Sequence, residues 1–104
     1  MPKIQQRKHM NYLNIYNRLM HKRHVIEPLA KSKQSPGKFE LHHIVPRSCN
    51  GSDIDSNKIL LTAREHVLAH HLLAKIYCNT QYAFNMLHTY YSMVGKKYQN
   101  SKSF

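Results

Sequence analysis

Residues 39–48, FELHHIVPRS, place two adjacent histidines just before a proline. Asn57 follows in the next segment, and His66 and His70 stand four residues apart farther along the chain. Side chains at positions i and i+4 of a helix lie on one face, so a helix here would present both imidazoles together. Adjacent histidines can divide two tasks between them, one binding a metal and the other accepting a proton from water. The pattern therefore predicts a histidine-bound metal with a histidine base beside it.

The order and spacing of these residues resemble the HNH endonucleases. Their ββα-metal motif runs from a strand with His-His, through a loop with Asn and a second strand, to a helix with the last ligands. Two groups are most similar: small phage-encoded stand-alone endonucleases, and colicin-type DNases with Glu-Leu-His-His and Thr-x-x-x-His-x-x-x-His, found here from Glu40 and Thr62. The resemblance covers residues 39–77. It implies a metal-dependent DNA endonuclease that hydrolyses phosphodiester bonds.

The order of the parts gives this resemblance its weight. With nine histidines in 104 residues, roughly one His-x-x-x-His pair is expected by chance. The pair His66 and His70 is also not the zincin signature, because Val67, and not a glutamate, follows His66. The pair therefore gains meaning only from the segments that precede it.

The resemblance implies a role for each histidine of the motif. His42, His66 and His70 would bind one divalent metal and leave positions for water and a phosphate oxygen. His43 would be the general base that takes a proton from the attacking water, since imidazole titrates near neutrality. Successive side chains of a strand face opposite sides, so His42 and His43 can serve one phosphate only if the strand ends or is distorted here, as Pro46 permits.

Five further residues are candidates for the site. Asn57 is expected to hydrogen-bond across the loop and fix the backbone that carries the base, although asparagine here is also a common turn residue. Glu40 is expected to orient a ligating histidine or pair with an arginine; the alternative is an ordinary exposed strand acid. Arg47, Lys58 and Arg64 flank the motif and are candidate phosphate contacts, with solvated charge as the alternative.

The ligand types limit the choice of metal. Imidazole favours Zn or Ni over Mg in affinity, but availability and geometry also select the ion, so Zn, Ni, Mn and Mg all stay open. Cys49 and Cys78 form no CxxC pair. The four-cysteine zinc ribbon of some HNH proteins is therefore missing, and any metal must be held mainly by histidine.

The charge of the chain indicates a polyanionic partner. Sixteen Lys and Arg against five acids give a formal net charge of +11, which favours nucleic acid. Double-stranded DNA is the expected partner, with RNA as the alternative. The first eight residues, MPKIQQRK, hold no apolar signal core, and no run approaches the ~20 apolar residues of a membrane span. We expect no membrane partner and a cytoplasmic location, in the host cell for a phage-encoded protein; the oligomeric state stays open.

The chain is predicted to form a single α+β domain over residues 1–104, with the ββα-metal motif flanked by an N-terminal and a C-terminal helix. An apolar stripe predicts the first helix over about 9–25, and Thr80 precedes the last, over about 81–94. Residues 27–38 are predicted to be a linker with a turn, and the tail after Gly95 to be loose. The stripe of the first helix consists of Tyr12, Ile15, Tyr16, Leu19 and Met20.

The motif core spans about 39–77. Strands are predicted over 39–45 and 58–62, and Thr62 and Glu65 stand in the relation of a capping box that starts a helix ending near Tyr77. On that helix the predicted buried stripe is Ala69, Leu72 and Ile76, with His66, His70 and Leu73 at its edge.

Two other functions compete with the nuclease. One is a non-catalytic nucleic-acid-binding protein with a structural metal, against which His43 argues because a purely structural site does not require it. The other is a histidine-rich protein whose basic surface binds RNA.

Overall fold

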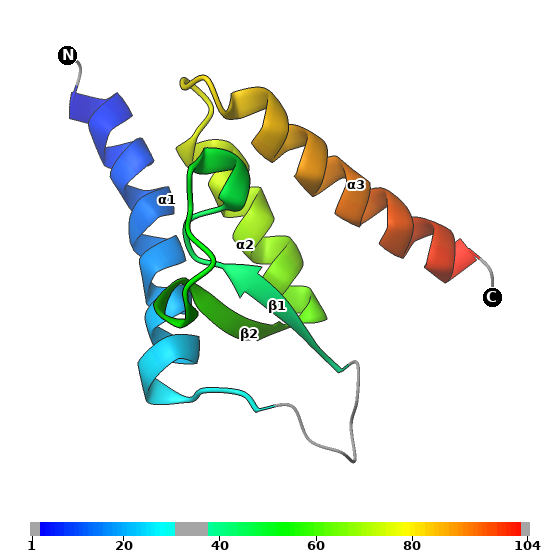
Figure 1. Ribbon diagram of the computed structural model, residues 1–104. Helices are drawn as coiled ribbons and strands as arrows, with labels where there is room; N and C mark the ends of the chain where they lie inside the picture. The colour runs from blue at the N-terminus through cyan, green and yellow to red at the C-terminus, as the bar shows by residue number, and fades with distance from the viewer. Residues whose placement is uncertain (1–2, 31–37, 103–104) are drawn as a thin grey trace.

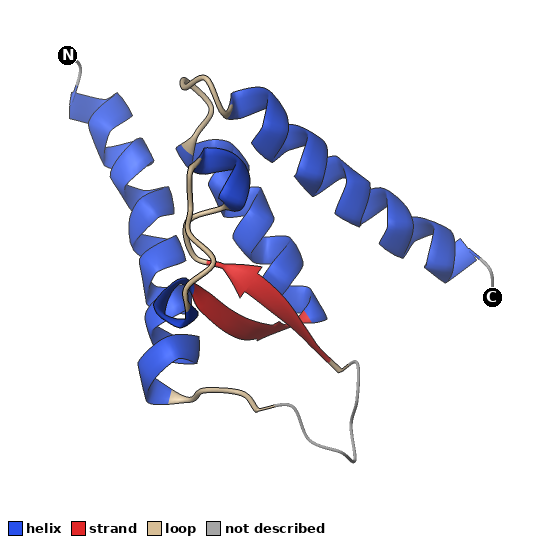
Figure 2. Ribbon diagram, viewed as in Figure 1, coloured by secondary structure: helices blue, strands red, loops and turns tan. Residues whose placement is uncertain are grey.

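The computed structural model describes residues 3–30 and 38–102, with side chains over 11–30 and 38–95. These residues form an α+β fold of three α-helices and one two-stranded antiparallel sheet, as the sequence predicts (Figure 2). In chain order the elements are α1 (Lys3–His21), a π-helical turn η1 (Lys22–Ile26), β1 (Phe39–His43), the 3₁₀ turns η2 (Arg47–Cys49) and η3 (Asp55–Asn57), β2 (Lys58–Thr62), α2 (Ala63–Ile76) and α3 (Ala83–Lys102).

Helix α2 is the centre of the arrangement. It packs against the β1–β2 hairpin, with α1 along one side and α3 along the other (Figure 1). The register pairs Glu40 with Leu61 and His42 with Ile59, so these four side chains share the face of the hairpin that meets α2. His42 is therefore brought into the interior by the same alternation that buries Leu61.

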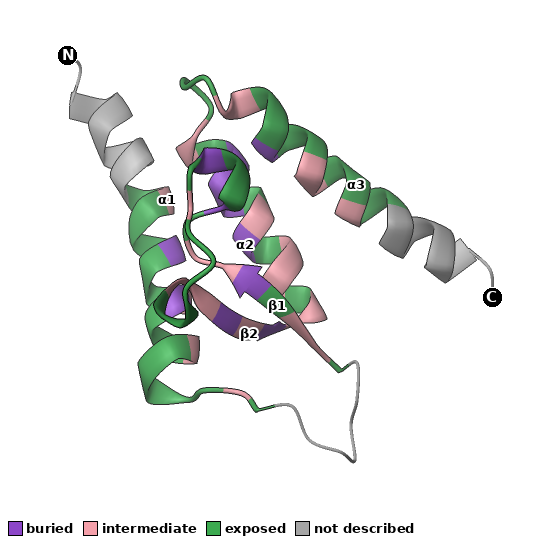
Figure 3. Cartoon of the chain, in the orientation of Figure 1, coloured by how far each residue is buried: buried purple, intermediate pink, exposed green. Residues whose placement is uncertain are grey.

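The core lies between α2, the inner face of the hairpin and one face of α1 (Figure 3). Leu73, predicted at the edge of the stripe on α2, is instead among the most buried residues, with 1% of its surface exposed. Ile15, predicted to be in the apolar stripe of α1, is 46% exposed, because α2 covers α1 over the narrower face that carries Tyr16 and Met20.

The structure corrects several predicted boundaries. Helix α1 begins at Lys3 and not near residue 9: its first turns are rich in Lys, Gln and Arg, good helix formers that hydrophobic periodicity does not detect. Strand β1 ends at His43 and not at Val45, because the backbone N–H of Val45 bonds to a side chain. Helix α3 continues to Lys102, so the prediction of a loose tail after Gly95 was wrong for residues 96–102. A single glycine costs a helix only about 1 kcal/mol, which is too little to end it.

Other expectations are confirmed. Thr62 Oγ1 accepts from Glu65 N at 3.1 Å, and Glu65 Oε1 accepts from Thr62 N at 3.0 Å, which completes the capping box at the start of α2. Of the predicted linker over residues 27–38, residues 31–37 lie outside the described residues. No helix among the described residues combines the length and apolar character needed to cross a membrane.

Candidate metal centre and nuclease site

Three histidines meet between the hairpin and α2. His42 comes from the end of β1, and His66 and His70 come from successive turns of α2, so that one ring nitrogen of each lies within 4.8 Å of the others. The centre of such a triangle is no more than about 2.8 Å from each nitrogen, against ~2.1 Å for a zinc–imidazole bond. A small inward rotation of the rings would therefore bring all three to one ion.

The outward nitrogens of two of these rings are already held. His66 Nδ1 lies 2.8 Å from Glu40 Oε1, and His42 Nε2 lies 2.8 Å from the Tyr16 hydroxyl. That hydroxyl has a single hydrogen, which it donates to the Ile44 carbonyl at 2.6 Å, so it accepts from His42 Nε2–H. His42 is thereby fixed in the tautomer whose lone pair is on Nδ1. Partners that fix the tautomer of a ligand in this way are typical of metal-binding histidines.

The third ring supplies the observation that fits the site to a metal. His70 Nδ1 is buried and has no hydrogen-bond partner among the described residues. A buried polar atom without a partner costs free energy, and an ion bound at Nδ1 would remove that cost. The donor set of three imidazoles, each with a nitrogen left over, suits a divalent ion of the zinc or nickel type.

Electrostatics favour the neutral form of two of these rings, His42 and His70. Burial, together with the neighbouring histidines, lowers the pKa of His42 from 6.5 to about 3. The same two causes, burial first and His66 second, lower the pKa of His70 to about 4. Both rings are therefore neutral at pH 7, the form in which imidazole binds a metal.

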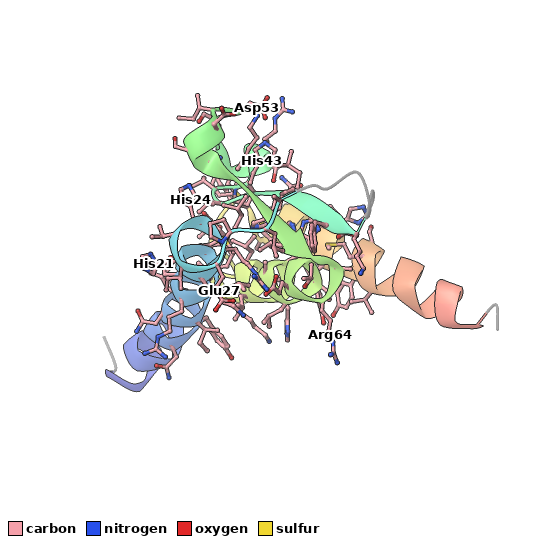
Figure 4. The ribbon with its side chains drawn as sticks, turned by 90° about the horizontal axis from the view of Figure 1, so that it is seen from below. His21, His24, Glu27, His43, Asp53 and Arg64 are labelled. Atoms are coloured by element: carbon pink, nitrogen blue, oxygen red, sulfur yellow. The ribbon has the colours of Figure 1, made fainter. Side chains whose placement is uncertain are left out.

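His43 lies next to the cluster but on the other side of the strand. Its side chain projects from the face of the hairpin opposite to that of His42. His43 Nε2 lies 2.8 Å from Asp53 Oδ1 (Figure 4). Because β1 ends at this residue, His43 nevertheless lines the same cavity of about 290 Å³ as the three clustered histidines and Arg47. The structure thus places a cluster of three histidines and a separate, partly exposed imidazole around one cavity.

Asn57 makes hydrogen bonds across the loop. Its Oδ1 accepts from Val45 N at 2.9 Å, and its Nδ2 donates to Val45 O at 3.0 Å and to Ser52 O at 2.8 Å. The side chain of Asn57 therefore takes the place of a neighbouring strand for the backbone of Val45, and it ties the loop at Ser52 to the end of β1. The loop also needs Gly51: a Cβ there would lie 1.7 Å from the Val45 carbonyl oxygen, far inside any allowed contact.

The three basic candidates are not equivalent. Arg47 lines the cavity, whereas Lys58 Nζ lies 3.8 Å from both Asp53 Oδ1 and Asp55 Oδ1 on the outer face of the hairpin. Arg64 is exposed at the start of α2, on the opposite side of the molecule from His43 in Figure 4. The structure brings Arg47 to the site, sets Lys58 at its rim and places Arg64 away from it.

An ion pair between Arg23 and Glu65 fixes the start of α2 beside His66. Arg23 from η1 donates from Nε to both oxygens of Glu65 at 3.0 Å, and its terminal nitrogen lies 2.9 Å from Oε2. Burial raises the pKa of Glu65, but the hydrogen bonds from Arg23 and Thr62 outweigh it and hold that pKa below its ordinary value. The carboxylate thus anchors the helix that carries two of the clustered histidines.

Sequence reasoning missed two residues that contact the site, Tyr16 and Asp53. Tyr16 was assigned only to an apolar stripe, although a buried tyrosine usually finds a partner for its hydroxyl, which was the available signal. Asp53 stands in the loop of a chain with only five acidic residues, and nothing in its local sequence predicts contact with His43.

Comparison with known proteins agrees with this geometry. Over 73 residues, 70% of its length, the chain is 47% identical to the probable mobile endonuclease C of Enterobacteria phage T4, covering 33% of that protein. It is 48% identical over 68 residues, 65% of its length, to the probable mobile endonuclease E of that phage, covering 44% of it. The chain is related to phage-encoded endonucleases. The resemblance seen in the sequence is thereby confirmed, and the names of these relatives support a nuclease function.

A third relative extends the match over most of the chain. The probable mobile endonuclease B of the same phage is 40% identical over 91 residues, 88% of this chain and 34% of that protein. The chain therefore spans less than half the length of each of these relatives. No family model and no solved structure matches the chain.

Proposed function

We propose that this chain is a metal-dependent endonuclease of the HNH type that hydrolyses phosphodiester bonds in DNA. One observation carries the proposal: a cluster of three histidines and a separate histidine, His43, border a single cavity. Similarity to mobile endonucleases supports the same activity. The basic chain, with its net charge of +11, suits double-stranded DNA in the host cytoplasm, and RNA is the alternative substrate.

The metal would be held by His42, His66 and His70. When bound, a divalent ion supplies a Lewis acid that stabilises negative charge on the phosphate and on the leaving oxygen. Zn, Ni, Mn and Mg are the candidates, and the imidazole donors favour the first two in affinity. Glu40 and Tyr16 would hold His66 and His42 in the orientation and tautomer that binding requires.

The remaining steps belong to the side chains around the cavity. His43 accepts a proton from water as the water oxygen bonds to phosphorus. The bond from phosphorus to the leaving oxygen breaks, and that oxygen takes a proton from solvent. Arg47 holds the phosphate, and Asn57 keeps the end of β1 in place beneath His43.

A non-catalytic protein with a structural metal is the alternative. Structural zinc usually has four protein ligands, whereas the cluster has three members within the described part of the chain. His43 also borders the cavity without joining the cluster. Both observations favour an open site with a base beside it.

Plasmid cleavage tests the proposal. Purified protein is incubated with supercoiled DNA and each of the four metals, with and without chelator. We expect metal-dependent cleavage that His43→Ala lowers by ~10²- to 10⁴-fold, the scale of general-base removal, with unchanged metal content. His24→Ala, which removes an exposed histidine of η1, is the control and should cleave normally. Cleavage by His43→Ala at the normal rate, or no cleavage with any metal, contradicts the proposal.

A further inference from the structure

The outer histidine of the site, His43, has an acidic partner that is not one of the residues named in the sequence motif. Asp53, in the loop between η2 and η3, places Oδ1 2.8 Å from His43 Nε2 (Figure 4). The hydrogen bond from His43, followed by the charge of Lys58, lowers the pKa of Asp53 below its ordinary value. An ionised carboxylate can only accept, so the hydrogen of this contact is on His43 Nε2.

The chain holds these two side chains together through Asn57. Asn57 bonds to Val45, two residues after His43, and to the carbonyl of Ser52, the residue before Asp53. One side chain therefore fixes the backbone on both sides of the contact. Lys58 adds a third restraint, because it is paired with His43 in the hairpin register and lies 3.8 Å from Asp53.

We propose that Asp53 is a positioning residue that holds His43 with its hydrogen on Nε2 and so leaves Nδ1 as the nitrogen that accepts the proton from water. The inference rests on the proposed role of His43 as base. A neutral imidazole otherwise exchanges between two tautomers and rotates about its side-chain bonds. When the ring takes the proton, its bond to the carboxylate becomes charge-assisted and stronger, which stabilises the state formed during the reaction.

Three variants separate this role from a general effect of charge. Asp53→Ala removes the acceptor; Asp53→Asn keeps an oxygen that can accept from Nε2–H but removes the charge. Asp55→Ala is the matched control, because Asp55 also lies 3.8 Å from Lys58 Nζ but is fully exposed. Asp53→Ala and Asp55→Ala remove the same charge from nearby positions. Any difference between them therefore reports the contact with His43.

The variants are measured by single-turnover plasmid cleavage, by metal content, and by ¹⁵N NMR of the His43 ring. We expect Asp53→Ala to cleave about 10- to 100-fold more slowly, the scale seen when the hydrogen-bond partner of a functional histidine is removed. Asp53→Asn should lie between it and the unaltered protein, and Asp55→Ala should cleave normally. All should keep their metal. The NMR spectrum should show hydrogen on Nε2 in the unaltered protein and mixed tautomers in Asp53→Ala.

The two readouts distinguish this inference from the proposed function. Equal cleavage rates for Asp53→Ala and Asp55→Ala, or a hydrogen on Nδ1 in the unaltered protein, would overturn the role of Asp53. If the unaltered protein cleaves no DNA with any metal, the proposed function fails. The ring tautomer and its response to Asp53→Ala then still show whether the carboxylate positions His43.

Discussion

Adjacent histidines of β1 lie in different environments on the two faces of the β1–β2 hairpin. His42, on the inner face, has 2% of its surface exposed and contacts the hydroxyl of a core tyrosine. His43, on the outer face, contacts Asp53, whose side chain is 63% exposed. A step of one residue along a strand thus moves an imidazole from the core to the rim of the cavity. Strand alternation can therefore separate the proposed metal ligand from the proposed base without an intervening residue.

The two faces are also built by different parts of the chain. The inner face is completed by helices: Tyr16 from α1 and the histidines of α2 surround His42. The outer face is completed by the loop between the strands, which Asn57 clamps to the end of β1. Helix packing sets the hydrogen-bond partner of His42, whereas loop geometry sets the partner of His43.

The largest expected effect separates two neighbours on α2. His70 belongs to the inner cluster, whereas His71 is exposed and stacks on Tyr90 with ring centroids 4.8 Å apart. Loss of a residue that only supports a metal ligand weakens metal binding by up to ~10²-fold. His70→Ala removes a proposed ligand itself, so metal binding should weaken by more than this. Cleavage should fall together with metal binding. His71→Ala should leave both nearly intact. Metal content and plasmid cleavage of the two purified variants test this.

The result also tests the register of α2. A turn of 100° per residue puts His70 within about 40° of His66 around the helix and displaces His71 by about 140°. Equal losses in the two variants, or a greater loss in His71→Ala, would mean that the inner cluster is assigned to the wrong residues.

Much of the inner face follows from local sequence signals. The His-His pair, the i and i+4 histidines and the Thr62–Glu65 capping box each act over a few residues, and together they predict the hairpin, α2 and the cluster. The alternation of β1 even predicts that His42 and His43 lie on opposite sides. These elements were predictable because the physics that forms them is short in range.

The remaining contacts depend on distance in the chain. Tyr16 reaches His42 across 26 residues of sequence separation, and Asp53 reaches His43 across 10. No local propensity specifies such pairs, since they depend on how α1 packs and where the loop folds back. The early start of α1 was missed for a different reason. Its first turns consist mainly of polar helix-forming residues, which show no periodic pattern of apolar positions.

The next effect tests whether the hydroxyl of Tyr16 supports metal binding through His42. Tyr16→Phe keeps the ring in the core but removes the hydroxyl that bonds to His42 and Ile44. Metal affinity should fall by ~10- to 100-fold, because the tautomer of His42 is no longer fixed. The buried partners left unpaired should also lower the free energy of unfolding by about 1–3 kcal/mol. Titration with a competing metal indicator measures the affinity, and chemical denaturation measures the stability.

Tyr12→Phe is the matched control, since Tyr12 lies one helical turn earlier on the same side of α1 and packs at the edge of the core. It should bind metal normally. If Tyr16→Phe also binds metal with unchanged affinity, the hydroxyl does not set the tautomer, and packing alone orients His42.

The last expected effect concerns stability alone: the acid sensitivity of the metal-free inner face. The lowered pKa values of His42 and His70, about 3 and about 4, mean that the unfolded chain binds more protons than the folded one below pH 6.5. The free energy of unfolding should therefore fall as the pH falls from 6.5, by up to about 1.4 kcal/mol per pH unit for each histidine. Down to pH 4.5, the ordinary pKa of a glutamate, Glu65 contributes little to this slope. Chemical denaturation of chelator-treated protein across this window measures it, and His70→Gln, which cannot titrate, should show a shallower slope. Parallel curves for the two proteins would show that His70 is not held neutral by its surroundings.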